Sequence, residues 1–199
     1  PDLWKNVYMA AFGSHHENIT RPNQLWEMDS TPADLMLIDG RYSVLGVIDM
    51  FTRRLKLLVS KTSKAEAVKQ VFRRATLAWG VAESVRTDNG KDYVSNAFVT
   101  VLRDLEIEHL LCLPFASEQK GTIERALGTM SHGLPDLLPG FIGHNVSERK
   151  AIEARKSFAQ RIMTPGEVVE VALTSEQLQE KLDKWADHVY AHNEHGGLN

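Results

Sequence analysis

The fold class is decided by SVLGVIDMFTRRLKLLVSKTSKAEAVKQVFRRATLAWG, residues 43–80, because the hydrophobic period changes partway along this stretch. Residues 43–50 and 54–60 are short runs rich in Val, Ile and Leu, as is typical of strands, and the gap between them is hairpin-sized. Beyond residue 63 the apolar side chains recur at helical spacing, at Ala67, Val71, Ala75 and Ala78. The stretch therefore predicts two paired strands followed by a helix.

Both ends of this helix carry boundary residues. Ser63, with Glu66 three residues later, has the pattern of an N-terminal capping box. Gly80 is typical of the residue that follows a helix C-terminus. We therefore expect the helix to begin just after Ser63, with Glu66 in the capping role, and to end at Gly80.

Further strands and helices are expected on both sides of this stretch. Residues 24–30 form a predicted strand, and Asp39-Gly40 supplies a turn before residue 43. Downstream we expect strands at 83–87 and 107–111 and helices at 96–105, 118–131 and 175–192, the last capped by Thr174 or Ser175. Three strands followed by alternating helices and strands predict an α/β fold with a five-stranded mixed sheet and helices on both faces.

Composition places the chain among ordinary folded domains. Its 199 residues are 43% hydrophobic and 25% charged, which is enough for a substantial core. We divide the chain into a lead-in segment at 1–23, a core at 24–165 and a C-terminal helical segment at 166–199. A single cysteine, Cys112, excludes an internal disulfide framework and a multi-cysteine zinc site. No run approaches the roughly 18 apolar residues of a membrane helix, so we expect an intracellular protein without a membrane partner.

The net charge of −3 is unevenly distributed. Residues 166–199 hold two lysines against seven acidic residues, whereas residues 1–165 hold 21 basic and 19 acidic residues. Neither part is strongly basic, so charge alone does not predict a nucleic-acid binder. The balance is still compatible with a DNA enzyme that grips its substrate through metal ions or through other domains.

Three carboxylates occupy positions where such a sheet would expose them. Asp29 lies in the first predicted strand, Asp88 follows the fourth, and Glu124 lies on the helix that begins near residue 118. Because sites in α/β sheets form where strand ends and helix termini converge, we expect the three side chains to meet. Two divalent cations about 3.5–4 Å apart can neutralise the charge that develops in phosphodiester cleavage, and Mg²⁺ prefers oxygen ligands. The residues alone thus predict two-metal phosphoryl transfer.

Several motifs resemble the catalytic core of the DDE transposase and retroviral integrase superfamily. They are PNQLWEMDST (22–31), VLGVIDMFTRRLKLLVS (44–60), RTDNGKDYVS (86–95) and PFASEQKGTIER (114–125). LPGFIGHN (138–145), after the predicted glutamate helix, is most similar to the bacteriophage Mu group of bacterial transposases. The resemblance implies a ribonuclease H-like fold, with Asp29, Asp88 and Glu124 as catalytic metal ligands.

The same resemblance implies an activity and partners. A DNA transposase core of this kind cleaves a strand at the transposon end and then joins the 3′-hydroxyl to target DNA. It uses two Mg²⁺ ions per active site, for which Mn²⁺ can substitute. We expect Lys120, Arg125 and Asn89 to contact DNA, although Asn89 has the alternative role of a turn residue that shapes the backbone at Asp88. The implied partners are double-stranded DNA, from transposon ends and target, and further copies of the full-length protein. The implied location is the cytoplasm of a bacterial host that carries a prophage or another mobile element, and the chain is expected to be one part of a longer protein.

Two other classes of function stay open. One is a stand-alone nuclease of the same fold, such as a ribonuclease H, in which Glu66 would take the place of Glu124 at the metal. The other is a non-catalytic DNA- or protein-binding module. Lys120 also has an alternative role, because a residue four positions before Glu124 is placed for a salt bridge along one helix face.

Two further sets of titratable residues have competing interpretations. Asp49 is either a fourth neighbour of the metals or, as we favour, a strand-end carboxylate bound by Thr52 or Arg53. Histidines at 188, 192 and 195 have a spacing that can hold zinc, but no fourth ligand is evident, so we do not expect a zinc site.

Overall fold

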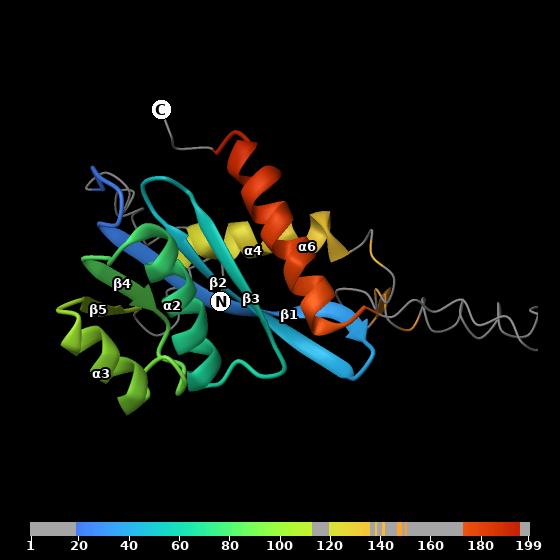
Figure 1. The fold of residues 1–199 in the computed structure, drawn as a ribbon, viewed down its shortest axis with the longest axis horizontal. Coiled ribbons are helices and arrows are strands. Elements are labelled where there is room, and N and C mark those ends of the chain that lie inside the picture. Colours follow the sequence, from blue (N-terminus) through green and yellow to red (C-terminus); the bar gives the residue numbers. More distant parts are fainter. Residues whose placement is uncertain are drawn as a thin grey trace, which may run out of the picture.

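Five strands form one mixed sheet, in the order β3-β2-β1-β4-β5 (Figure 1). They are β1 (Leu25–Leu37), β2 (Gly40–Asp49), β3 (Leu55–Ser60), β4 (Ser84–Thr87) and β5 (Glu108–Leu111). The structure is a computed structural model that describes residues 19–112, 120–135, 138, 141, 147–148, 150 and 173–195. The predicted five-stranded mixed sheet is confirmed.

Strand direction brings distant parts of the chain to one side of the sheet. β2 pairs antiparallel with both β1 and β3, as expected of consecutive hairpins, whereas β4 pairs parallel with β1 and with β5. The strand that carries Asp29 therefore runs in the same direction as the strand that ends just before Asp88. β1 is longer than predicted and continues to Leu37, with a shift in register between Pro32 and Met36, so Asp29 lies within the strand.

The main helices pack on opposite faces of the sheet and create two hydrophobic clusters. They are α2 (Ala65–Trp79), α3 (Asn96–Asp104), α4 (Gly121–Gly133) and α6 (Ser175–His188). Alternate residues of β1 and β2 point to opposite faces, as the pleat requires. One cluster packs Trp26 and Met28 against α2 and α3, and the other packs Leu25 and Ile48 against α4 and α6. Figure 1 shows α2 and α4 on opposite sides of the strands.

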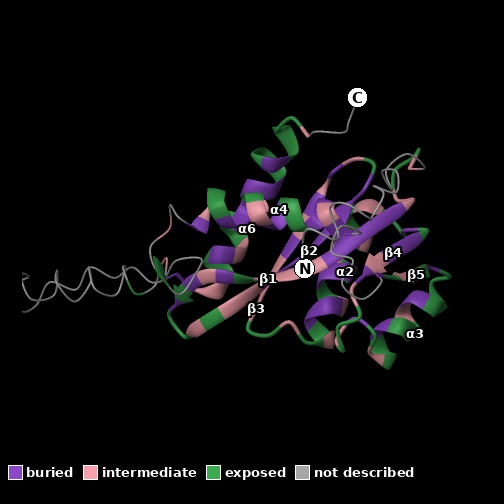
Figure 2. Ribbon diagram, turned by 180° about the vertical axis from the view of Figure 1, so that it is seen from behind, coloured by how far each residue is buried: buried purple, intermediate pink, exposed green. Residues whose placement is uncertain are grey.

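The burial pattern follows these layers. In Figure 2 the central strands are mostly buried, whereas α3 and α6 carry exposed residues. The face of β1 that packs against α4 carries Leu25, Glu27 and Asp29, because these residues alternate along the strand. Two carboxylates therefore lie on the inner side of the sheet, next to a helix.

The predicted capping box at the start of α2 is wrong. The helix begins at Ala65 with Lys64 as its N-cap residue, and no side chain caps it. Glu66 instead forms an ion pair of 2.6 Å with Lys69, three residues later on the same helix. The pattern matched the motif, but the chain enters the helix one residue after Ser63. The predicted end is confirmed, since Gly80 caps the helix with a φ of 94°.

The C-terminal helix is shorter than predicted. α6 ends at His188 and a 3-10 turn, η3 (Tyr190–His192), follows it. Its predicted N-cap is confirmed: the Thr174 hydroxyl accepts a hydrogen bond from Gln177 N, and the Gln177 side chain accepts one from Thr174 N. A complete capping box thus forms here, although it was predicted at α2.

Parts of the predicted organisation lie outside the described residues. Residues 19–23 are the described portion of the predicted lead-in segment, and the predicted helix at 118–131 is observed from Gly121. The motif at 138–145 falls almost wholly outside the described residues. Within the described part of the chain, no helix is long and apolar enough to cross a membrane.

Candidate active site

The three predicted carboxylates are presented by three different elements. Asp29 lies within β1, opposite Gly46 of β2. Asp88 is the first residue after β4, and Glu124 lies in the first turn of α4. Asp29 is largely shielded, with 16% of its side chain exposed, whereas Asp88 is 41% exposed. A strand, the residue after a strand and the first turn of a helix thus each supply one of the three carboxylates.

Asp88 sits in a tight turn whose geometry depends on its neighbours. Its Oδ1 accepts a hydrogen bond of 2.8 Å from Gly90 N. A Cβ atom at Gly90 would lie 2.8 Å from that same oxygen, so glycine leaves room for the carboxylate. Asn89, which we predicted to contact DNA, donates from Nδ2 to the Cys112 carbonyl at 2.8 Å and ties the ends of β4 and β5 together. One use of the Asn89 side chain is therefore to hold the turn.

Lys120 brings Asp29 and Asp88 together. Its Nζ lies 3.1 Å from Asp29 Oδ1 and 3.4 Å from Asp88 Oδ2, and 9% of its side chain is exposed. The salt bridge to Glu124 that helical spacing allowed is not among the ion pairs of the described residues. The two aspartates, separated by many residues in sequence, instead share one cation.

The two aspartates keep the Lys120 side chain protonated although it is buried. Burial alone lowers the pKa of Lys120, but the charges and hydrogen bonds of Asp29 and then Asp88 outweigh it, so the pKa is raised. The ammonium is therefore firmly protonated and neutralises part of the carboxylate repulsion. A position that two carboxylate oxygens use to hold one cation has the donor chemistry of a hard divalent ion, which prefers oxygen ligands.

Glu124 approaches the same aspartate from another direction. A cavity of about 280 Å³ is lined by both Asp29 and Glu124, together with Asp34 and residues further along α4. Asp29 thus belongs both to the cation cluster and to the cavity that Glu124 faces. Among the described residues, no three carboxylate, histidine or cysteine side chains form a preassembled metal cage. The site unites Asp29 with Asp88 and Asp29 with Glu124, around a single shared aspartate.

Glu27 is a buried carboxylate that the sequence analysis missed. It is 1% exposed; its Oε2 accepts a hydrogen bond of 3.0 Å from Ile123 N, and its Oε1 pairs with Arg86 of β4 at 3.2 Å. Burial raises the pKa of Glu27, and the bonds from Ile123 and Arg86 partly offset that effect. Because Ile123 precedes Glu124, Glu27 fastens the start of α4 to the strand that carries Asp29. Its signal in the sequence was an acid two residues before Asp29, on the same face of the strand.

Tyr93 is a second missed residue beside the carboxylates. The residue is 4% exposed, and its hydroxyl has no hydrogen-bond partner among the described residues. Burial, followed by the negative charges of Asp29 and Asp88, raises the pKa of Tyr93 well above its usual range. Tyr93 is therefore a buried neutral hydroxyl whose pKa is affected by the two aspartates.

Asp49 has the structural role that we favoured over metal binding. It is fully buried, and its Oδ1 accepts hydrogen bonds from the backbone N–H groups of Phe51 and Thr52 and from the Thr52 hydroxyl. Its Oδ2 accepts from Asn23 N at 2.6 Å. These bonds shape the β2–β3 hairpin.

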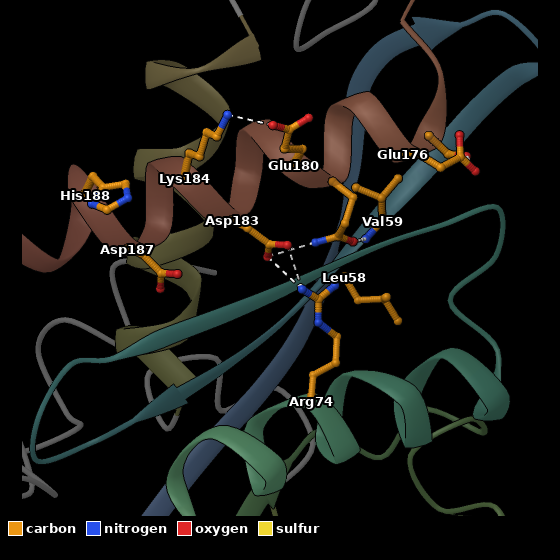
Figure 3. A pocket seen from close by; sticks show the side chains of 11 residues that line it. Leu58, Val59, Arg74, Glu176, Glu180, Asp183, Lys184, Asp187 and His188 are labelled. Carbon is orange, nitrogen blue, oxygen red and sulfur yellow. Dashed lines mark hydrogen bonds and ion pairs between the residues drawn. The ribbon is translucent and has the colours of Figure 1, made fainter.

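A larger cavity lies away from the carboxylate cluster. It measures about 630 Å³ and lies between α6, β3 and α2 (Figure 3). The figure shows Arg74 and Asp183 pointing toward one another, and their closest atoms are 2.7 Å apart. Asp187 pairs with Lys56, and Glu180 with Lys184. Most carboxylates of this cavity form ion pairs with lysine or arginine side chains, so they do not form a cluster of unpaired acids that would bind a metal.

The other candidate ligands do not form a site. Glu66, the acid expected at the metal in a ribonuclease H, is paired with Lys69 and lies outside the cavity lined by Asp29 and Glu124. Among the described residues, the histidines at 188, 192 and 195 do not belong to any group of three metal-ligating side chains.

A family comparison covers the part of the chain that contains the five strands. Residues 19–117 of the chain match the family described as "Integrase core domain". The matched stretch, about half of the chain, contains Asp29 and Asp88 and ends before Glu124. This part of the chain is similar to an integrase core domain.

Similar sequences occur in retroviral polyproteins and in bacterial transposases. The chain is 33% identical over 111 residues to the Intracisternal A-particle Pol-related polyprotein of the mouse intracisternal A-particle, covering 55% of this chain and 12% of that protein. It is 23% identical over 149 residues to the transposase for transposon Tn552 of Staphylococcus aureus, covering 67% of this chain and 31% of that protein. The chain thus spans less than a third of either relative.

The fold is shared with a retroviral assembly. One chain of the simian T-cell lymphotropic virus intasome, solved in complex with a PP2A regulatory subunit, superimposes with a TM-score of 0.55 and 22% identity. The match covers 81% of this chain and 57% of that one. The predicted ribonuclease H-like fold is confirmed by this similarity and by the sheet order.

Proposed function

We propose that the chain is the catalytic core of a DNA transposase. The observation that carries the proposal is the convergence of Asp29 and Asp88 on one cation, with Glu124 facing a cavity that Asp29 also lines. The match of residues 19–117 to an integrase core domain supports it. The reaction is strand cleavage at transposon ends, followed by attack of the new 3′-hydroxyl on target DNA.

The carboxylates are proposed to hold two Mg²⁺ ions, with Mn²⁺ able to substitute. Bound ions of this kind lower the pKa of a water or hydroxyl nucleophile and stabilise the charge on the phosphoryl oxygens. Asp29 and Asp88 supply oxygen ligands in place of their contacts to Lys120, and Glu124 completes the set from α4. Glu27 keeps Glu124 in register by binding the start of that helix. Tyr93 offers a neutral hydroxyl beside the two aspartates.

The proposed DNA contacts are Lys120, Arg125 and Asn89. Once displaced from the aspartates, the Lys120 ammonium is a donor for a substrate phosphate, since lysine binds phosphate as a point charge. Arg125 is exposed on α4, where its Nε donates to the Gly121 carbonyl at 3.0 Å. Asn89 already uses one amide N–H in the turn, so its contact to DNA uses the remaining polar atoms of its side chain.

The wider context is also part of the proposal. We infer double-stranded DNA partners, both transposon ends and target, and a homo-multimer of the full-length protein in the cytoplasm of a bacterial host. The transposase name of one relative and the intasome named for the similar structure support this context. Within the superfamily we propose the bacteriophage Mu group, on the sequence pattern of residues 138–145.

A strand-transfer assay tests the proposal. The full-length protein, supplied with Mn²⁺ and labelled transposon-end DNA, is compared with Asp29→Asn, Asp88→Asn and Glu124→Gln. We expect each variant to lose at least about a hundredfold in joining, because one ligand of the charge-stabilising site is removed. Asp104→Asn, an exposed acid on α3, is the matched control and retains joining. A variant of the three that joins DNA like the wild type would remove that residue from the site.

A further inference from the structure

Helix α4 separates two cavities of opposite charge. Residues 124, 127, 128 and 131 line the cavity that contains Asp29, whereas residues 122, 125, 126 and 129 line a second cavity of about 160 Å³. At about 100° per residue these two sets lie on opposite faces of the helix. The first cavity is acidic, through Asp29, Asp34 and Glu124. The second contains two arginines, Arg53 and Arg125, against one acidic residue, Glu194.

Arg53 is a buried cation in the wall of this second cavity. It is 5% exposed, and its Nη1 donates to the Thr122 hydroxyl at 3.4 Å. Burial lowers the pKa of Arg53, and the positive charge of Arg125 also acts in that direction, while Tyr190, Glu27 and Asp49 oppose it. A guanidinium remains charged under such shifts, so two positive groups face one small space. An anion in that space relieves their repulsion.

His195 contributes a polar atom that is already buried. Its Nε2 is shielded from solvent and has no hydrogen-bond partner among the described residues. The imidazole lies against the Tyr190 ring, with centroids 4.7 Å apart, which fixes it at the wall of the cavity. A buried nitrogen without a partner is unfavourable, and a bound oxyanion would accept a hydrogen bond from its N–H tautomer.

We propose that the cavity between Arg53, Arg125 and His195 binds one phosphate group, which belongs to the backbone of a DNA strand lying across α4. The two guanidiniums supply the forked donors that suit phosphate oxygens, and His195 and Thr122 supply neutral donors. A cavity of about 160 Å³ has room for a group of this size. The site positions the strand and takes no part in bond making.

That the phosphate belongs to a DNA strand rests on the proposed function. That the cavity binds a phosphate group does not depend on it. A helix with its side chains is about 10–12 Å across, so a strand whose reacting phosphate lies beside Glu124 has another phosphate within reach of the far face. The pocket is therefore an anchor a few nucleotides away from the carboxylates. Inorganic phosphate offers the same chemistry, and the experiment must distinguish the two sources.

The first arm titrates inorganic phosphate into isotope-labelled protein at constant ionic strength, without divalent ions, and follows side-chain NMR signals. We expect saturable shifts at the Arg125 guanidinium and the His195 ring. Arg125→Gln should weaken phosphate binding about tenfold, as the loss of one charge-assisted hydrogen bond predicts. Arg103→Gln, an exposed arginine on α3 paired with Asp104, is the matched control and leaves phosphate binding unchanged.

The second arm measures binding of a short DNA duplex, by fluorescence anisotropy at several salt concentrations and again without divalent ions. We expect Arg125→Gln to lower the salt slope by about one and DNA to compete with inorganic phosphate for the cavity. Arg53→Lys keeps the positive charge but loses the paired N–H donors of the guanidinium. This variant should bind both inorganic phosphate and DNA more weakly. If that buried variant does not fold, Arg125→Gln alone decides.

Absence of saturable shifts at Arg125 and His195 would overturn the phosphate site. Phosphate binding without DNA competition, and with an unchanged salt slope, would overturn the DNA backbone as its source. Either result would also remove Arg125 from the proposed DNA contacts, but neither bears on the proposed roles of the carboxylates and of the divalent ions. Conversely, an active Asp29→Asn variant would refute the proposed function while the phosphate measurements stand.

Discussion

At the scale of single residues, the site is governed by one cation shared between two aspartates. Lys120 is nearly buried and remains charged because Asp29 and Asp88 flank it. In the absence of divalent ions the lysine lowers the repulsion between these carboxylates. The lysine also competes for the oxygens that a metal would use. Its removal should therefore destabilise the metal-free protein and strengthen metal binding.

Lys120→Gln is predicted to lower the unfolding free energy of the metal-free protein by about 1–2 kcal/mol, through the loss of charged hydrogen bonds. The same variant should bind Mn²⁺ about tenfold more tightly, because the competing charge is gone. Urea denaturation in EDTA and titration calorimetry with Mn²⁺ measure the two effects. Lys61→Gln, which breaks an exposed pair with Asp39, serves as control. Unchanged or weaker Mn²⁺ affinity in Lys120→Gln would show that the lysine and the metal use different places.

Sequence reasoning proposed the three carboxylates as the site and Asn89 as a turn residue, but it did not find the residues that contact them. Asp29, Asp88 and Glu124 stand in recognisable motifs at strand and helix ends. Glu27 and Tyr93 look like an ordinary strand acid and an ordinary aromatic until the helix lies over the sheet. Their roles depend on contacts with Ile123 and with the aspartates, and no local spacing encodes those contacts.

At the scale of elements, the approach of α4 to the sheet sets the position of Glu124. Gly46 of β2 lies directly under the helix: a Cβ atom there would be 3.1 Å from Ile123 Cδ1 and from Leu127 Cδ2. Both of those side chains are buried, so they have little room to move. Glycine at this position lets the helix lie close to β1, where Asp29 pairs in register with Gly46.

Gly46→Ala should therefore destabilise the fold by about 1–3 kcal/mol, as overpacking does. It should also weaken Mn²⁺ binding, because α4 and Glu124 must shift outward. Gly128→Ala on α4 is the matched control: nothing lies within 4 Å of its Cβ position, and helix propensity predicts a gain of about 0.5–1 kcal/mol. Urea denaturation of both variants tests this, and a Gly46→Ala protein as stable as the wild type would contradict the close packing.

The element boundaries show where local patterns were sufficient. Gly80 ends α2 and Thr174 begins α6 as predicted, because each cap depends on its own neighbours in sequence. The capping box at Ser63 did not form, because Glu66 pairs with Lys69 and the Asp92 carboxylate accepts a hydrogen bond from Ala65 N. A side chain from a distant segment thus replaced the local cap. The extension of β1 to Leu37 likewise depends on its pairing with β2.

At the scale of the whole molecule, the number of strands and the mixed character of the sheet were predicted from the sequence, because hairpins and helical crossovers leave few alternatives. The order of the strands within the sheet comes from the structure. The packing of both sheet faces was also predictable from alternating apolar residues. The cavity lined by Arg53, Arg125 and His195 could not be predicted, because these residues converge from three separate segments of the chain. Global properties such as the dependence of stability on pH likewise depend on burial that the sequence does not reveal.

His109 of β5 provides a pH test of the assembled sheet. It shares a hydrogen bond of 2.9 Å with the Thr87 hydroxyl, and burial lowers its pKa from the ordinary value of 6.5. Between the lowered pKa and 6.5 the unfolded chain binds more protons than the folded chain, so stability rises with pH in that window. The contribution is complete above about pH 6.5 and is lost as the pH falls through the folded pKa.

The measurement is the unfolding free energy at pH 8 and pH 5 for the wild type and His109→Gln. We expect the wild type to lose more stability on acidification than the variant does, because the variant lacks the group that must take up a proton. An equal loss in both proteins would mean that His109 is not shielded as the sheet requires.

We propose that Asp29, Asp88 and Glu124 hold divalent cations, and a crystal soaked in Mn²⁺ and examined by anomalous scattering tests this. We expect an anomalous peak in contact with the Asp29 and Asp88 carboxylates, with Glu124 turned toward it and the Lys120 ammonium displaced. If saturating Mn²⁺ leaves both aspartates paired with Lys120, or binds only elsewhere, these three residues do not form the metal site.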